Sequence, residues 1–392
     1  MARFTIPRDV YFGQGTIEEL KNIKAKKAII ITGVKSLKDN GSLEKIEANL
    51  KEAGIETKIL GGMEPDPTIE KVMEGAKVMQ EFGPDLIVGV GGGSPIDSAK
   101  AMWIFYEYPE LSFEEVIVPF TLPELRKKAR FVAISTTSGT GTEVTSFSVI
   151  TDHKTGIKYP IADFNITPDI AIVDSDLVKS MPAELRAFTG MDALTHAVEA
   201  YVSTVKNEFT DALAMQSIDI IRDNLINSYK GNENAGSKMH LAQNLAGMSF
   251  SNAILGIVHS MAHKTGRTLN IEGGLPHGCA NAIYLPFAIE FNKKVASKEY
   301  AKIARYLGLN GKTDCELTDS FVEMVRNLSK EMNIPATLKE FGIDEEVFMS
   351  KVDELAEAAV ADPCTGTNPR EISVEEMKKL FVCTYYGEKV DF

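Results

Sequence analysis

The first 180 residues alternate short apolar runs with longer segments of helical periodicity. Runs rich in β-branched residues predict buried strands, and the amphipathic segments between them predict helices. We expect strands at Lys27–Gly33, Glu56–Leu60, Asp85–Val90, Phe131–Thr136 and Asp169–Asp174, and helices at Ser42–Ala53 and Thr68–Phe82. Buried strands separated by helices are typical of a parallel sheet that is covered by helices on both faces.

The pattern changes after about residue 180, where helical periodicity continues and strand-like alternation does not return. Here we expect helices at Asp192–Ser203, Asp211–Leu225, Lys238–Ile257, Lys298–Arg305 and Leu317–Met332. The sequence therefore predicts an α/β fold. A doubly wound parallel-sheet domain covers residues 1–180, and an all-helical domain covers residues 181–392.

Composition limits which partners the protein can bind and predicts its cellular compartment. The net charge of −13 argues against nucleic acid or an anionic membrane as a partner, because no basic stripe offsets it. No apolar run approaches the roughly 18 residues of a membrane span, and the N-terminus lacks the regions of a signal peptide. The four cysteines show no CxxC spacing. We expect a soluble, cytoplasmic protein with reduced thiols.

Three consecutive glycines, Gly91 to Gly93, follow the predicted strand Asp85–Val90. Ser94 as N-cap, Pro95 in the first turn and Asp97 in a capping box predict that a helix begins there. Glycine lets a ligand approach the backbone, and a helix N-terminus offers N–H groups and a positive dipole to a phosphate. A tight turn with no ligand would also need glycine, so this loop alone leaves both interpretations open.

A second loop, Ile134–Thr145, also follows a predicted strand and is rich in hydroxyl groups. They belong to Ser135, Thr136, Thr137, Ser138, Thr140 and Thr142. An open α/β sheet binds its ligand at the carboxyl ends of its strands, where both loops lie. Together the loops favour a dinucleotide-binding domain, although their spacing differs from the usual G-x-G-x-x-G.

Candidate metal ligands lie in the helical half of the chain. Asp192 and His196 are four residues apart on one predicted helix, and His259 and His263 repeat that spacing. His277 follows at a Pro-His-Gly turn. One carboxylate with several imidazoles suits Fe²⁺ or Zn²⁺ better than Mg²⁺ or Ca²⁺. A single histidine on a helix is more often structural than a ligand, and the paired spacing is what favours a metal site.

These motifs resemble the iron-containing (group III) alcohol dehydrogenase family over essentially the whole chain. The segments that carry the resemblance are GGGSPIDSAKA, STTSGTGTEVT, TGMDALTHAVEAYVS, HSMAHKTG, PHGCANAIYLP and DPCTGTNPRE. At greater distance the chain is similar to glycerol dehydrogenase and dehydroquinate synthase, which share the two-domain plan.

The resemblance implies a role for specific residues. It implies that the metal, Fe²⁺ or less favourably Zn²⁺, is bound by Asp192, His196, His259 and His277. It implies cofactor contacts from Gly92, Gly93, Ser94, Asp97, Thr136, Thr137, Thr140 and Lys158. It also implies a homodimer or a higher homo-oligomer.

The expected reaction is hydride transfer between NAD(P) and a primary alcohol or aldehyde, with a metal ion that polarises the substrate oxygen. His263 is the candidate proton relay, because imidazole titrates near neutral pH. Glu199 shares a helical face with Asp192 and is expected to support a ligand or to face solvent. The alternatives are a diol or glycerol dehydrogenase, a dehydroquinate-synthase-like lyase, and a helical binding protein without activity.

Cofactor and substrate preference rest on fewer residues. NAD-using dehydrogenases place a carboxylate against the ribose 2′-hydroxyl, but here Gly33 and Ser36 follow the first core strand. This favours NADP, with NAD as the alternative. The resemblance also implies a substrate pocket bordered by Phe147, Phe250 and Cys364, apolar enough for butanol. The two phenylalanines could instead simply pack the protein core.

Overall fold

The computed structural model describes residues 3–33, 41–152, 158–269, 271 and 274–392. Its contacts divide the chain into two compact units. Unit 1 is Met1–Met181 and unit 2 is Pro182–Phe392. Each unit has its own hydrophobic core, and each is described separately here.

Unit 1 is built on a six-stranded sheet with the order β1-β8-β5-β4-β2-β3. All neighbouring strands in it pair in parallel. The strands are β1 (Asp9–Phe12), β2 (Lys27–Gly33), β3 (Glu56–Met63), β4 (Leu86–Gly91), β5 (Arg130–Ser135) and β8 (Ile170–Val173). The predicted parallel sheet is confirmed. The edge strand β1 was not expected, because its four residues, DVYF, make only a very short run that is partly exposed.

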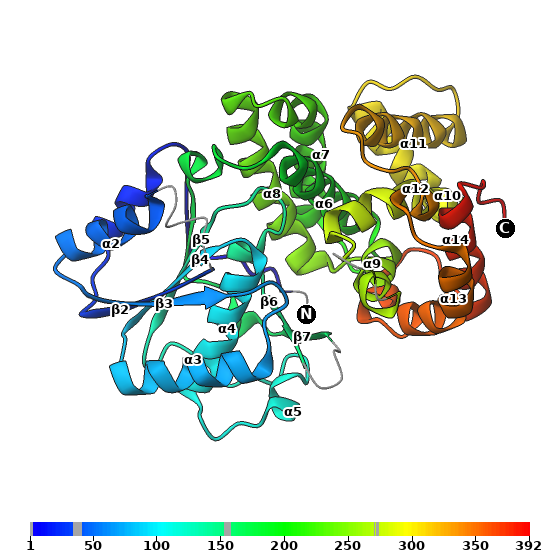
Figure 1. Ribbon diagram of the computed structural model, residues 1–392. Helices are drawn as coiled ribbons and strands as arrows, with labels where there is room; N and C mark the ends of the chain where they lie inside the picture. Colours follow the sequence, from blue (N-terminus) through cyan, green and yellow to red (C-terminus); the bar gives the residue numbers. More distant parts are fainter. Residues whose placement is uncertain (1–2, 34–40, 153–157, 270, 272–273) are drawn as a thin grey trace. The chain divides into compact units, whose positions relative to one another are not determined.

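Helices cover both faces of this sheet (Figure 1). Ile29 and Ile31 of β2 pack on one face with α3 (Ile69–Phe82) and α4 (Gly93–Glu107). Ile30, whose side chain points the opposite way, packs with α2 (Ser42–Glu52). Because both faces are buried, the strands are apolar throughout, which is why the sequence showed them as continuous runs.

Shorter elements complete unit 1. An antiparallel pair, β6 (Phe147–Thr151) and β7 (Lys158–Ala162), follows the hydroxyl-rich loop and was not predicted. The remaining elements are η1 (Thr16–Asn22), α5 (Phe113–Val116), η2 (Thr142–Val144), η3 (Phe164–Ile166) and η4 (Ser175–Val178).

Unit 2 is helical over its described residues, as predicted. Its elements are α6 (Ala183–Val202), α7 (Glu208–Tyr229), α8 (Glu233–Ala253), α9 (Ile257–Thr268), α10 (His277–Tyr306), α11 (Asp314–Glu331), α12 (Leu338–Phe341), α13 (Glu345–Val360), η5 (Pro363–Thr367) and α14 (Val374–Tyr386). No single helix among the described residues is long and apolar enough to cross a membrane. All four cysteines of the chain are free thiols.

Three predicted helices in unit 2 have wrong boundaries. The helix expected to begin at Asp192 is α6, which begins nine residues earlier, at Ala183. The segment Lys238–Ile257 is not one helix, because the chain breaks at Ile254 (φ 60°, ψ −166°) and α9 begins at Ile257. The predicted helix Lys298–Arg305 is only the end of the 30-residue α10, which is kinked at Ala296. Helical periodicity identified the buried faces but could not locate a break that tertiary packing imposes.

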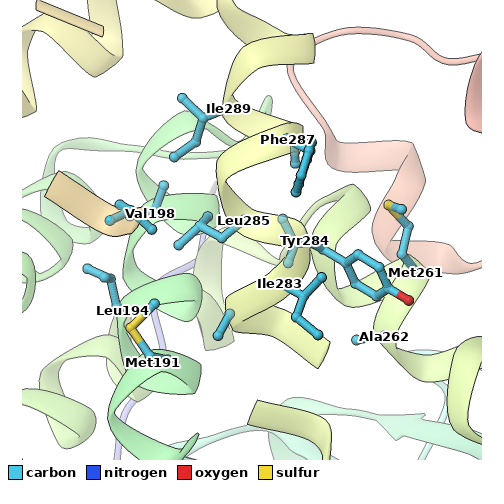
Figure 2. Packing of buried hydrophobic residues seen from close by; sticks show 14 of the residues in the cluster. Met191, Leu194, Val198, Met261, Ala262, Ile283, Tyr284, Leu285, Phe287 and Ile289 are labelled. Atoms are coloured by element: carbon cyan, nitrogen blue, oxygen red, sulfur yellow. The ribbon is translucent and has the colours of Figure 1, made fainter. Parts of the chain in front are cut away.

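Three helices of unit 2 meet in one part of its core. Figure 2 shows apolar side chains of α6, α9 and α10 packed together, among them Leu194, Met261 and Tyr284. The Tyr284 hydroxyl shares a 2.6 Å hydrogen bond with Thr265 of α9. Between α6 and α10 the backbones also approach closely, at Gly278. A Cβ atom added there would lie 2.1 Å from the carbonyl oxygen of Phe188.

This contact predicts that Gly278→Ala destabilises unit 2 by about 1–3 kcal/mol or more, since α6 and α10 must separate to admit the methyl group. Chemical denaturation of metal-free protein measures the effect. Gly266→Ala in α9 is the matched control, because its added Cβ meets nothing closer than 3.7 Å and alanine favours a helix. Equal stability of Gly278→Ala and the wild type would contradict the prediction.

Candidate metal centre and cofactor loops

The four predicted metal ligands come together in unit 2. Nε2 of His196, His259 and His277 lies 3.8, 3.7 and 3.6 Å respectively from Oδ1 of Asp192. Asp192 and His196 are one turn apart on α6, His259 lies in the first turn of α9, and His277 begins α10. Asp192, His196 and His259 form one buried group whose donor atoms all lie within 4.8 Å of one another, and His277, on a third helix, approaches this group at Asp192.

The donor set fits a divalent transition-metal ion. Ligand atoms about 2.1 Å from a shared ion lie roughly 3.4 Å apart in a tetrahedron, close to the separations measured from Asp192. Asp192 and His259 are almost fully buried, and the His277 side chain is 43 % exposed. One oxygen and three nitrogen donors are the mixture that Fe²⁺ and Zn²⁺ bind well.

Glu199 supports one of these ligands. Its Oε2 atom lies 2.5 Å from Nδ1 of His259, and its Oε1 atom accepts a 2.7 Å hydrogen bond from the Val258 amide. A carboxylate that accepts the Nδ1 proton leaves Nε2 of the imidazole free for a metal. Of the two expectations for Glu199, support of a ligand is therefore the one that the geometry agrees with.

Ring stacking holds the imidazole of His196, and nearby charges shift the pKa values of Asp192 and His259. The His196 ring stacks on Phe250 with centroids 4.3 Å apart and on His259 at 4.6 Å. Burial raises the pKa of Asp192, but the surrounding imidazoles, His196 first, hold that pKa well below its usual value. Burial also lowers the pKa of His259, yet its contacts with Asp192 and Glu199 raise the pKa to about 9 overall. A metal that binds Nε2 of His259 must therefore displace a proton.

His263 lies beside this cluster and has a carboxylate partner of its own. Its ring stacks on His277 with centroids 5.5 Å apart, and its Nδ1 atom lies 3.2 Å from Oδ2 of Asp362. Lys264 also contacts Asp362 Oδ2, at 2.8 Å. Burial raises the pKa of Asp362, but His263 and Lys264 together lower that pKa well below its usual value. The carboxylate is thus ionised and able to orient the imidazole.

The predicted pocket residues lie in different units. Phe250 of α8 stacks on the ligand His196, and Cys364 donates its backbone N–H to Asp362 Oδ1 at 3.0 Å. Both lie next to the metal cluster in unit 2. Phe147 begins β6 in unit 1, and its carbonyl accepts a hydrogen bond from Lys100. Its part in a pocket stays a prediction.

In unit 1 the two predicted cofactor loops touch each other. A Cβ atom added to Gly92 would lie 3.2 Å from the Thr137 side chain, and one added to Gly93 would lie 3.4 Å from Thr140. Thr136 donates its amide to the Gly91 carbonyl at 2.9 Å. The buried Thr137 hydroxyl has no hydrogen-bond partner among the described residues. The position that requires glycine is Gly91, which has a φ of 151° and where an added Cβ atom would lie 2.7 Å from Pro95. An open backbone beside an unpaired hydroxyl suits a phosphate.

The capping box predicted for Ser94 and Asp97 was wrong. Helix α4 begins at Gly93 with Gly92 as N-cap, and no side chain caps it. Instead, Asp97 accepts hydrogen bonds from the Thr142 hydroxyl at 2.6 Å and from the Val149 amide at 3.0 Å. The first-turn N–H groups therefore lack a side-chain cap, and Asp97 ties α4 to the second loop. The part of Ser94 and Asp97 in cofactor binding stays a prediction.

A buried lysine, Lys100, also connects α4 to the second loop and to the segment that follows it. Nζ of Lys100 contacts the Thr145 carbonyl at 2.8 Å, the Phe147 carbonyl at 2.8 Å and the Thr142 hydroxyl at 3.4 Å. Burial lowers the pKa of Lys100 to about 8, against the opposite effect of Asp97 and Glu143. The ammonium group is solvated by the protein itself, and it holds the segment after the hydroxyl-rich loop against α4.

The other predicted cofactor residues are placed less decisively. Lys158, at the start of β7, forms a 2.5 Å ion pair with Asp66. Gly33 ends β2, and a Cβ atom added there would lie 3.5 Å from Pro95 of α4. Ser36 lies outside the described residues. Contact of these residues with a cofactor stays a prediction.

Comparison with known families identifies the family of this chain. Residues 7–175 match the family model described as iron-containing alcohol dehydrogenase. Residues 186–385 match the model for the C-terminal part of the Fe-containing alcohol dehydrogenase family. The chain belongs to the iron-containing alcohol dehydrogenase family. The expected fold class and family resemblance are confirmed, and the protein is an oxidoreductase.

Individual relatives of this alcohol dehydrogenase cover its whole length. It is 59 % identical over 392 residues to the NADPH-dependent butanol dehydrogenase of Clostridium saccharobutylicum, covering 100 % of both chains. It is 41 % identical to the bifunctional aldehyde-alcohol dehydrogenase of Escherichia coli, with 97 % of this chain but 46 % of that protein covered. A crystal structure of 1,3-propanediol oxidoreductase is 35 % identical, covers 98 % of this chain and 100 % of its own, and has a TM-score of 0.91.

Asp362 and Lys100 were missed as supporting residues by the sequence analysis. Asp362 lies 99 residues from His263, and Lys100 lies 45 residues from Thr145. Both lie inside motifs that the sequence singled out, DPCTGTNPRE and GGGSPIDSAKA, which was the one available signal. Nothing local indicated which distant side chain each would contact.

The Glu199–His259 pair predicts the effect of Glu199→Gln on metal binding. The charge of the Glu199 carboxylate orients the His259 imidazole and raises its basicity. Glutamine keeps the shape of the side chain but lacks this charge, so metal affinity should fall about 10–100-fold. Competition with a chromogenic chelator measures the dissociation constant directly.

Glu184→Gln is the matched control, because Glu184 is exposed in the first turn of the same helix, eight residues before Asp192. Its metal affinity should equal that of the wild type. An unchanged dissociation constant in Glu199→Gln would show that the carboxylate has no influence on the ligand.

Proposed function

We propose that this chain is an iron-dependent, NADP-preferring dehydrogenase that interconverts primary alcohols and aldehydes, with short- to medium-chain aliphatic substrates such as butanol. The observation that carries the proposal is the convergence of three imidazole Nε2 atoms within 3.8 Å of Asp192 Oδ1. The full-length identity of 59 % to an NADPH-dependent butanol dehydrogenase supports the substrate class and the cofactor.

A divalent ion bound by Asp192 and the three histidines would supply Lewis-acid stabilisation of negative charge on the substrate oxygen, worth several kcal/mol in the transition state. The nicotinamide, when bound, supplies the hydride acceptor for oxidation and the donor for reduction. The protein must therefore hold both groups and move the remaining proton, the one on the substrate hydroxyl.

His263 is suited to move that proton. With its Nδ1 proton donated to the ionised Asp362, Nε2 carries the lone pair that accepts a proton during alcohol oxidation and returns one during aldehyde reduction. The side chain is partly exposed, so the proton can exchange with solvent. Asp362 stabilises the imidazolium that forms, and Lys264 keeps Asp362 ionised.

Cofactor binding is assigned to the two loops of unit 1. The uncapped N-terminus of α4 and the unpaired Thr137 hydroxyl support pyrophosphate binding at Gly92 and Gly93. Gly33 ends strand β2 without a carboxylate, which supports a preference for NADP over NAD.

Two other reactions are weaker candidates. A diol oxidoreductase is favoured by the likeness to 1,3-propanediol oxidoreductase, but Phe250 presents an apolar surface beside the ligands. A dehydroquinate-synthase-like lyase would need free basic groups near the metal for a substrate phosphate. Lys264, the basic residue next to His263, is already paired with Asp362.

Compartment and assembly are also part of the proposal. The free state of all four cysteines supports the reducing cytoplasm as the working compartment. A homodimer is the assembly that we propose, and size-exclusion chromatography with light scattering tests it.

An alcohol series tests the reaction and the substrate class. Each added methylene in an apolar pocket contributes about 0.8 kcal/mol, so butanol should exceed ethanol by roughly 1.6 kcal/mol, or about fifteenfold in kcat/KM. The kcat/KM for 1,2-propanediol should exceed that for ethanol only slightly. Burying its second hydroxyl without a hydrogen bond costs more free energy than burying its extra carbon contributes.

The series is run on iron-reconstituted enzyme, with chelated enzyme as the control. Activity that survives chelation, with metal analysis showing no ion, would overturn the metal-dependent proposal. A clear preference for the diol would overturn the aliphatic substrate class.

The cofactor preference predicts the effect of Gly33→Asp. The new Cβ atom makes only ordinary contacts, with Pro95 at 3.5 Å and the Met63 carbonyl at 3.6 Å, so the variant should fold. A carboxylate here repels the 2′-phosphate of NADP and accepts a hydrogen bond from the ribose of NAD. The NADP/NAD ratio of kcat/KM should fall at least about tenfold.

Gly33→Asn is the control, because it adds nearly the same shape without charge. A wild-type enzyme that prefers NAD, or a ratio that moves equally in both variants, would contradict the assignment of Gly33.

A further inference from the structure

One side chain inside the metal cluster has no assigned role. Asn281 of α10 lies one turn after His277 and is fully buried. Its amide nitrogen donates to Oδ1 of Asp192 at 2.7 Å and lies 3.2 Å from Nε2 of both His259 and His277. Asn281 therefore contacts three of the four proposed ligand atoms, each from a different helix.

The other end of the same amide is unusual. Oδ1 of Asn281 is buried and has no hydrogen-bond partner among the described residues. A buried, unpaired amide oxygen costs free energy, so the contacts of the nitrogen must offset that cost for the side chain to stay in this orientation. The contact that can offset this cost is the hydrogen bond to the carboxylate of Asp192, because each Nε2 atom has one lone pair, which the proposed metal would use.

We propose that Asn281 is a positioning residue of the metal centre, which fixes Asp192 with Oδ1 directed toward the three imidazoles. Without such a bond the carboxylate could rotate about its Cβ–Cγ bond and direct either oxygen, or the space between them, at the ion. The inference rests on the proposed function, because it assumes that Asp192 and the histidines bind a metal.

The position of Asn281 on α10 also explains how it acts on more than one ligand. His277 and Asn281 are four residues apart and lie on the same face of the helix, so the helix itself fixes their separation. Through Asn281 this face of α10 is hydrogen-bonded to α6 at Asp192, 89 residues away in sequence. The geometry of the ligand set therefore depends on a side chain that is not itself one of the four ligands.

The test is metal affinity, measured without catalysis. Asn281→Leu keeps a similar volume but removes the donor, and it should bind Fe²⁺ under anaerobic conditions, and Zn²⁺, about 10–100-fold more weakly than the wild type. Chelator competition gives the dissociation constants, and the rise in melting temperature on metal addition gives a second readout. Asn281→Ser, which is smaller and too short to reach Asp192, should show the same loss if the leucine variant does not fold.

The matched control is Asn49→Leu. Asn49 is a buried asparagine in unit 1 that donates to the Ile17 carbonyl at 3.1 Å, so its loss should lower stability without changing metal affinity. Asp192→Ala distinguishes failure of the proposed metal centre from failure of the role proposed for Asn281. If the wild type binds no ion, the metal centre itself is wrong. If the wild type binds the ion, Asp192→Ala does not, and both Asn281 variants bind as tightly as the wild type, only the role of Asn281 is overturned.

Discussion

A carboxylate that is almost fully buried, as Asp192 is, must be compensated by positive charge or hydrogen bonds, because an isolated buried charge costs several kcal/mol. Three imidazoles and the Asn281 amide supply that compensation. The imidazoles need support in turn, which Glu199 gives to His259 and Phe250 gives to His196. Much of the polar organisation of this part of unit 2 follows from the burial of that one negative charge.

Close packing of the helix backbones brings the side chains around Asp192 together. Gly278 lets α10 approach α6 so closely that no side chain fits between the Gly278 Cα atom and the Phe188 carbonyl. The break at Ile254 ends α8 and lets α9 start in a new direction, with His259 in its first turn. The apolar core of α6, α9 and α10 next to these residues keeps the ligands in place (Figure 2). Rigid secondary structure is a better support for a metal site than loops are.

In unit 1, buried polar contacts hold the two proposed cofactor loops together. Asp97 and Lys100, one turn apart on α4, bind Thr142 and the segment that follows it. Burial raises the pKa of Asp97 and lowers that of Lys100 to about 8, and the attraction between the two opposite charges opposes both shifts. These internal contacts leave the glycines and the Thr137 hydroxyl as the groups that we propose for phosphate binding.

The sequence by itself determined the features that depend on local periodicity and residue type. These are the buried strands of the parallel sheet, the helical second half, the glycine and hydroxyl loops, and the paired spacing of Asp192 with His196. Short or irregular elements such as β1, and the break at Ile254, escaped because nothing in a local window distinguishes them.

Only the tertiary structure decided which distant groups meet. Glu199 reaches His259 across 60 residues, Asn281 reaches Asp192 across 89, and Asp362 reaches His263 across 99. Asp97 was expected to cap α4, yet it binds the second loop instead. Hydrogen bonds of this kind depend on how whole helices pack, and the hydrophobic pattern that directs this packing gives no information about which polar side chains face each other.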